Sequence, residues 1–355
     1  MKKLLGLLTL ILAVSGFAEA DQDVLKNINI STEYRQNYQD KTGDDANGIG
    51  FAGFKKNNRG RTRVRSIFSG KIGLVDEGDW DLTFSTRWDK DQNRNRFNGQ
   101  KITQYGTFRK ADRIYSKLGL EKKLSDDVKL KIRWQNDTYR NKNLVTKETS
   151  TTGIGNEFAI GPTFNRKVWG QNVTLAVEGV YFGFKGNRRG EYYLSGNDFK
   201  GSKVNGWGLN ADLEVSNNIK KGEWGSLDYY TYFTNHYRDT NKTQKNGKKA
   251  KPSVYQDYYA NLSYTTPSFA GIYGKVVLEN EFERYPRYYW ENMLGVITEA
   301  GYKKSFGAGE GRVSVNPFVK YRPYYRDSYK ESGSNRKTTE TEEVRFGLSV
   351  GYSVN

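Results

Sequence analysis

One histidine and no cysteine limit the chemistry that this 355-residue chain can perform. A Ser–His or Asp–His catalytic site would need His236 beside a nucleophile or an acid, and Asp228 and Asp239 are acids close to it in the sequence. No catalytic motif surrounds these residues, and the chain has no P-loop or dinucleotide fingerprint. Metal sites commonly use cysteine or clustered histidine. The sequence therefore predicts no enzyme, no metal site and no cofactor.

Charged residues that recur at every second position are the more informative pattern. In the segment 128–140, Lys129, Lys131 and Arg133 share one face of an extended strand, because successive strand side chains point to opposite faces. The other face is apolar and consists of Val128, Leu130, Ile132 and Trp134. Such a segment predicts a strand with one face toward water and the other toward lipid.

Fourteen segments of the chain alternate in this way. They span residues 24–36, 61–74, 80–90, 112–123, 128–140, 156–168, 172–184, 203–215, 224–238, 253–265, 272–284, 290–304, 312–325 and 342–354. Both faces of 172–184 are apolar, and the face assignment of 290–304 could slip by one, so twelve or sixteen strands remain possible. Lipid cannot satisfy unpaired backbone groups, so the sheet must close. We expect an all-β, transmembrane, antiparallel up-and-down β-barrel of about fourteen strands.

The connections between these segments are alternately short and long. The short ones are 75–79, 124–127, 169–171, 216–223, 266–271 and 307–311. The other seven are mostly longer and polar and lie around 37–60, 91–111, 141–155, 185–202, 239–252, 285–289 and 326–341. Short periplasmic turns and long external loops are typical of an outer-membrane barrel.

The N-terminus has the features of a secretory signal peptide. Lys2 and Lys3 precede an apolar stretch, and Ala18-Glu19-Ala20 fits the A-x-A cleavage pattern. We expect residues 1–20 to be removed and 21–355 to form a single barrel domain in the outer membrane of a Gram-negative cell. Elsewhere no apolar run approaches the roughly 20 residues of a membrane helix. The mean hydropathy of −0.84 does not argue against a barrel, because the polar inner face of each strand offsets its apolar outer face.

Tryptophans predict where the barrel meets the lipid headgroups. Trp80 and Trp88 are eight residues apart on one face, which is about 20 Å along the axis at roughly 40° tilt and near the height of an apolar band. The expected aromatic girdles comprise Trp80, Trp88, Trp134, Trp169 and Trp224.

The inner face is expected to be strongly charged. The basic residues predicted to line the pore are Arg63, Arg65, Lys71, Arg87, Lys129, Lys131, Arg133, Arg312, Lys320, Arg322 and Arg345. The acidic ones predicted on the opposite wall are Asp257, Glu279, Glu281 and Glu283. Facing walls of opposite charge would act on charged or dipolar solutes, whereas pairing of these charges across strands would only keep the lumen wet. Inward Tyr230, Tyr232, Tyr255 and Tyr259 could stack on sugar rings or simply narrow the pore.

The signal peptide, the fourteen segments and the absence of a plug domain make the chain resemble monomeric outer-membrane porins of the porin G type. That resemblance implies a wide, single-chain diffusion channel gated by mobile loops. The chain is also similar in character to oligogalacturonate-type porins, which use fewer strands and a basic lumen for acidic sugars. It departs from such barrels at its end, Tyr352-Ser353-Val354-Asn355, where an aromatic final residue is usual. Tyr352 or Phe346 could serve instead.

These features favour an ion-conducting outer-membrane porin that passes small hydrophilic solutes, with a mild preference for anions and with oligosaccharides among the possible solutes. The alternative is a surface adhesin or receptor that displays the basic loops 239–252 and 326–341. Expected partners are outer-membrane lipid, small hydrophilic or anionic solutes and the barrel-assembly machinery. The net charge of +17 alone would suggest nucleic acid, but the signal peptide argues against it.

Overall fold

The computed structural model describes residues 25–41, 59–74, 80–95, 109–143, 149–186, 203–240, 242–286, 289–309, 311–330 and 337–354. The expected signal peptide, 1–20, lies outside these residues, as do parts of most of the expected long loops. Within the described residues, no helix is long and apolar enough to cross a membrane.

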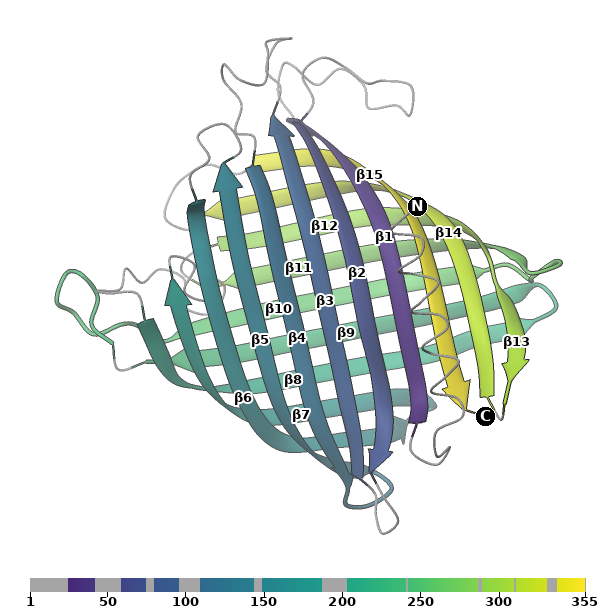
Figure 1. The fold of residues 1–355 in the computed structure, drawn as a ribbon, viewed down its shortest axis with the longest axis horizontal. Coiled ribbons are helices and arrows are strands. Elements are labelled where there is room, and N and C mark those ends of the chain that lie inside the picture. Colours follow the sequence, from purple (N-terminus) through teal and green to yellow (C-terminus); the bar gives the residue numbers. More distant parts are fainter. Residues whose placement is uncertain are drawn as a thin grey trace.

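Every strand belongs to one antiparallel sheet that closes on itself (Figure 1). Its strands are β1 (Leu25–Lys41), β2 (Arg59–Leu74), β3 (Trp80–Asn95), β4 (Arg109–Lys123), β5 (Val128–Asn143), β6 (Thr149–Val168), β7 (Gln171–Gly186), β8 (Lys203–Gly222), β9 (Gly225–Asp239), β10 (Ser253–Thr265), β11 (Ile272–Tyr285), β12 (Tyr289–Tyr302), β13 (Lys304–Ala308), β14 (Gly311–Lys330) and β15 (Lys337–Val354). Lys303 interrupts β12 and β13, which both pair with β14 and so occupy one position. The described part of the chain is therefore a closed, fourteen-stranded, up-and-down β-barrel, as the alternation predicts.

The barrel closes where the first strand meets the last. Asn27 lies opposite Ser353, and the register continues without a shift to Lys41 opposite Thr339. In Figure 1 the purple strand β1 runs beside the yellow strand β15. In the described barrel, closure leaves every strand except the short β13, which pairs only with β14, with a neighbour on each side, so no long sheet edge is unpaired.

The two faces of the barrel differ in polarity. Large apolar side chains are exposed on the outer face of most strands, for example Trp88, Phe158, Leu209, Leu278 and Phe346. All seven tryptophans lie on this outer face or at its turns, because they alternate in phase with these residues. On the inner face the buried residues are mostly charged or polar, as detailed below. An apolar surface of this extent requires an apolar surrounding, which favours insertion into lipid.

Two connections differ from the expected boundaries in an informative way. The turn between β6 and β7 contains only Trp169 and Gly170, which both have positive φ (49° and 78°), as in two-residue hairpins whose twist matches the strands. Strand β8 continues to Gly222, with a register shift between Asn218 and Lys220, so the expected turn 216–223 is too long. Polar residues at this end of β8 remain strand because β9 supplies hydrogen-bonding partners for them.

Strand β7 has apolar residues on both faces for two separate reasons. Leu175, Val177 and Tyr181 are exposed on the outer face. Phe182 and Phe184 point inward and are buried in a cluster with two further residues, Val204 of β8 and Ala250 of the β9–β10 connection. The end of this connection thus packs inside the barrel mouth, and the inward phenylalanines are the apolar surface that it contacts.

Glycines make room for these two phenylalanine rings. A Cβ at Gly155 would lie 2.6 Å from the Phe184 ring. A Cβ at Gly206 would lie 2.8 Å from Phe182 Cζ and only 1.9 Å from the Asp239 carbonyl oxygen. Each ring therefore lies over a glycine of a neighbouring strand, an arrangement that shields the glycine backbone and fixes the aromatic rotamer.

Candidate functional site

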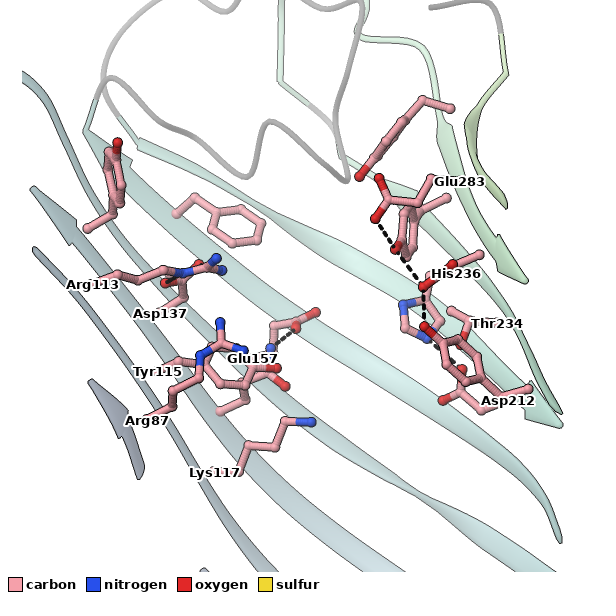
Figure 2. A pocket seen from close by; sticks show the side chains of 18 of the residues that line it. Arg87, Arg113, Tyr115, Lys117, Asp137, Glu157, Asp212, Thr234, His236 and Glu283 are labelled. Carbon is pink, nitrogen blue, oxygen red and sulfur yellow. Dashed lines mark hydrogen bonds and ion pairs between the residues drawn. The ribbon is translucent and has the colours of Figure 1, made fainter. Parts of the chain in front are cut away.

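A cavity of about 690 Å³ occupies the barrel interior (Figure 2). It is lined from one side by residues of β3 and β4 and from the other by residues of β8 to β11, with β5 and β6 between them. The lining is almost entirely charged, tyrosine or amide side chains, which the inward phase of each strand supplies. Such a lining holds water, and two clusters of charged side chains lie within it.

The first group is a basic cluster around one phenol ring: Arg87, Arg113 and Lys117 surround Tyr115. Tyr115 of β4 lies directly opposite Arg87 of β3, and Arg113 and Lys117 precede and follow it by two residues on the same face. The cationic groups are 5.2, 5.7 and 5.3 Å from the ring centroid, respectively, which is within cation–π range. The stacking fixes the direction of three positive charges into the cavity.

The second group is an acidic cluster: Asp257, Glu281 and Glu283. Asp257 of β10 lies directly opposite Glu283 of β11, and ligand oxygens of all three carboxylates are within 4.8 Å of one another. Tyr232 and Tyr255 donate hydrogen bonds to Asp257 Oδ2 over 2.7 and 3.1 Å, and Tyr255 also reaches Glu283 at 3.3 Å. Carboxylates so arranged could hold a cation, either a hard divalent metal ion or an ammonium group.

A closed ring of hydrogen bonds, two of whose members (Gln135 and Glu157) line the cavity, joins five adjacent strands. Arg133 (β5) donates to Glu178 (β7) at 2.6 Å and to Gln135 at 2.7 Å, and Gln135 donates to Glu157 (β6) at 3.0 Å. Arg238 closes the ring. It donates to Glu157 at 2.6 Å and to Asn210 (β8) at 2.8 Å, and Asn210 donates to Glu178 at 3.1 Å.

The ring contains two guanidiniums and two carboxylates, so its formal charges cancel. Every member is buried, and Arg238 is 0% exposed. A buried, charge-balanced network of this kind stiffens the wall without contributing net charge to the lumen.

Most of the basic residues predicted to line the pore are ion-paired on the inner face. Their partners are Asp91 for Arg63, Asp89 for Arg65 and Arg87, Asp81 for Lys71, Glu121 for Lys131, Glu178 for Arg133, Glu299 for Lys320, Glu279 for Arg322 and Glu343 for Arg345. Arg63 and Arg65 make bidentate hydrogen bonds to acids directly opposite them on β3. Lys129 and Arg312 have no acidic partner within 4.0 Å among the described residues. Pairing across strands, one of the two sequence interpretations, therefore describes most of this set.

Of the four predicted acidic residues, one is ion-paired on the wall and three belong to the acidic cluster. Glu279 accepts from Arg322 at 2.5 Å and from Tyr259 at 3.1 Å, so it belongs to the paired wall. Asp257, Glu281 and Glu283 form the acidic cluster, of which Asp257 and Glu283 line the cavity. Of the inward tyrosines, Tyr232 and Tyr259 stack on each other at 5.6 Å, so part of their ring surface is already covered.

The tryptophans predicted to form girdles lie on the outer side. Trp169 is 95% exposed and Trp224 is exposed at short turns, and Trp80 begins β3. Trp88 and Trp134 are farther from the loop ends than expected, because β3 extends to Asn95 and β5 to Asn143. Two separate girdles remain a prediction.

His236 contacts an acid that the sequence does not suggest. Its Nε2 is 2.9 Å from Asp212 Oδ1, on the neighbouring strand β8, rather than beside Asp228 or Asp239. Asp212, Tyr115, Arg113 and Lys117 are cavity residues that the sequence prediction missed. The sequence does contain an indication of them, because each lies on the same face of its strand as other charged residues. Which residues of neighbouring strands they meet, however, follows only from the register of the sheet.

Comparisons with known proteins show similarity at the level of shape. No protein-family model matches the chain, and no curated protein matches it in sequence. Among solved structures it is similar to a Pseudomonas aeruginosa FadL homologue (8% identity, TM-score 0.47, covering 96% of this chain and 92% of that one). It is also similar to the P. putida toluene transporter TodX (6%, 0.44, 96% and 92%) and to OmpT, an outer membrane protein of Vibrio cholerae (11%, 0.35, 91% and 97%). The assignment of the barrel fold rests on the strand pairing of the chain itself.

Proposed function

We propose that the chain is an outer-membrane porin: a water-filled, passive diffusion channel for small hydrophilic solutes. The observation that supports this most directly is the inversion of polarity across a closed sheet. Apolar side chains are exposed outward, while charged side chains surround a cavity of about 690 Å³ inside. A soluble barrel would bury its apolar residues instead, so lipid outside and water inside best account for both faces.

A mild preference for anions is the finer part of this proposal. It is supported by the net charge of +17 and by inner-face cations without an acidic partner within 4.0 Å among the described residues, such as Lys117, Lys129 and Arg312. Because most other inner-face cations are paired, the preference should be small. Oligosaccharides are less favoured than smaller solutes, since the inward tyrosines partly stack on one another.

Reconstitution of the full chain in a planar bilayer tests the proposal. We expect stepwise ion-conducting events and, under a KCl gradient, a reversal potential that indicates a chloride permeability less than about tenfold above that of potassium. The same preparation should release small sugars from liposomes. Folded protein that inserts without conducting would refute the pore. Conduction with clear cation selectivity at low salt would refute only the anion preference.

A further inference from the structure

The basic and acidic clusters face each other across the barrel. With β12 and β13 counted as one, the closed sheet has fourteen strand positions. Strands β4 and β11 are seven positions apart in either direction around it, and so are β3 and β10. Figure 2 shows Arg87, Arg113 and Lys117 on one side of the cavity and Glu283 on the other, with open space between them. The two clusters are therefore too far apart around the wall to pair with each other and can act on one molecule between them.

The basic cluster retains positive charge. Asp137 neutralises Arg113 through two hydrogen bonds of 2.7 and 2.6 Å. Arg87 approaches Asp89 only at 3.4 Å, and Asp89 is already held by Arg65 in a bidentate pair, so one carboxylate serves two guanidiniums. Lys117 is exposed to the cavity and has no acidic group within 4.0 Å among the described residues. Arg87 and Lys117 thus offer donors to an anionic group.

The acidic cluster has no salt-bridge partner among the described residues. Like charges directly opposite each other on paired strands repel, and Asp257 and Glu283 are such a pair. In the described part of the structure no lysine or arginine lies within 4.0 Å of Asp257, Glu281 or Glu283. Asp257 is buried, and its Oδ1 has no hydrogen-bond partner there. In the described residues, therefore, no lysine or arginine forms an ion pair with the acidic cluster.

Aromatic rings beside the acidic cluster indicate what kind of positive group fits. Tyr255 and Tyr285 both line the cavity, with ring centroids 5.0 Å apart, and Tyr232 is adjacent. Carboxylates combined with tyrosine faces are suited to an organic ammonium, which gains both charge pairing and cation–π contact. A bare metal ion would use the carboxylates but would leave the basic cluster without a partner.

We propose that this cavity is a binding site for a small zwitterion, with its ammonium at Asp257 and Glu283 and its carboxylate at Arg87 and Lys117. The cavity volume is in the range of small-molecule sites, about 300–1,000 Å³. The inference rests on the proposed function, because it names a solute that would bind on its way through the channel.

The test uses the full chain in planar bilayers and the zwitterion ω-aminohexanoate as the probe. Two analogues of similar length control for single charges: ω-aminohexanol has only the ammonium and ω-hydroxyhexanoate only the carboxylate. We expect the zwitterion to reduce the ion current at a concentration about tenfold lower than either analogue, since each lost charged contact removes one charge-assisted hydrogen bond. Equal effects of all three compounds would overturn the proposal while leaving the pore intact.

Matched substitutions locate the site. Lys117→Gln and Glu283→Gln should each weaken the effect of ω-aminohexanoate about tenfold, to the level of the singly charged analogues. Lys129→Gln and Glu121→Gln remove inner-face charges away from the cavity lining and should leave it unchanged. Equal sensitivity in all four variants would mean a general field effect and no site.

Calorimetric titration of the detergent-folded protein separates this inference from the proposed function. Binding of ω-aminohexanoate without conductance would support the site and refute the pore. Conductance without binding would refute the site alone. Calcium binding at the acidic cluster that is lost in Glu283→Gln, with no response to the zwitterion, would also overturn the proposal.

Discussion

Arg238 is a guanidinium with no exposure to solvent, and its position depends on two partners from other strands. Glu157 accepts from it at 2.6 Å and Asn210 at 2.8 Å, and its guanidinium carbon is 5.9 Å from the centroid of the Phe182 ring. Replacing one partner of a buried ion pair leaves the other charge buried without compensation, which costs more than the pair contributes.

We therefore expect Arg238→Met to lower the free energy of unfolding by about 3–5 kcal/mol, because Glu157 then stays buried as an unpaired carboxylate. Urea titration of the protein in liposomes, followed by the folded-to-unfolded mobility shift on gels, measures the loss. Adding Glu157→Gln to this variant should recover at least half of it. An additive second loss would show that the two residues do not depend on each other.

Residue partners are the part of the interior that the sequence could not provide. Alternation correctly indicates that Arg63 and Arg65 share a face, but their acids, Asp91 and Asp89, lie on a separate strand. Glu157 and Arg238 are 81 residues apart. A shift of one residue in register would move every partner to the opposite face, so pairs follow only from the assembled sheet.

At the scale of the strand, β7 shows how an element can serve both faces. Its outward residues contribute to the apolar surface, and its inward phenylalanines pack against Ala250 of the β9–β10 connection. This packing requires Gly206 on β8, where the Phe182 ring and the Asp239 carbonyl oxygen occupy the space that a side chain would need.

Gly206→Val should consequently destabilise the barrel by about 1–3 kcal/mol, because the new Cβ would meet backbone as well as the phenylalanine ring. The melting temperature in detergent, followed by circular dichroism near 215 nm, reports the change. Gly183→Val is the matched control, since no atom lies within 4 Å of a Cβ at that position. Equal melting temperatures for the two variants would contradict the packing argument.

The strands themselves are largely predictable from the chain. A period of two locates all fourteen positions, and the segments 253–265 and 272–284 agree with β10 and β11 to within one residue. The differences arise where polar residues extend a strand beyond the apolar alternation, as in β8 beyond residue 215 and β14 beyond residue 325. There, hydrogen bonds to the neighbouring strand hold the backbone extended without help from burial.

At the scale of the whole molecule, the outer face should tolerate charge according to depth. Leu278 lies near the middle of β11 and is 53% exposed, whereas Leu124 is 57% exposed at a short turn. The two leucines have similar exposure but different distances from the ends of the barrel.

Leu278→Arg should cost about 2–4 kcal/mol in a lipid bilayer, and Leu124→Arg about 0–1 kcal/mol, because a charge near the midplane cannot be solvated. Equilibrium folding into liposomes from urea measures both values. In detergent the difference should shrink, since micelles admit water more readily. Equal costs in lipid would contradict the assignment of the outer face to the membrane.

The seam between β1 and β15 has a consequence for the time course of folding. Asn29 accepts a hydrogen bond from Ser349, 320 residues later, and Ile28 and Ile30 pack against Tyr352 across the same boundary. The partner of β1 is therefore the last strand that the structure describes, and it is synthesised long after β1. Until then one edge of β1 has unpaired backbone groups, which invite pairing with other chains. Closure of the sheet must therefore wait for β15, a strand of eighteen residues, and contacts so far apart in the sequence form slowly.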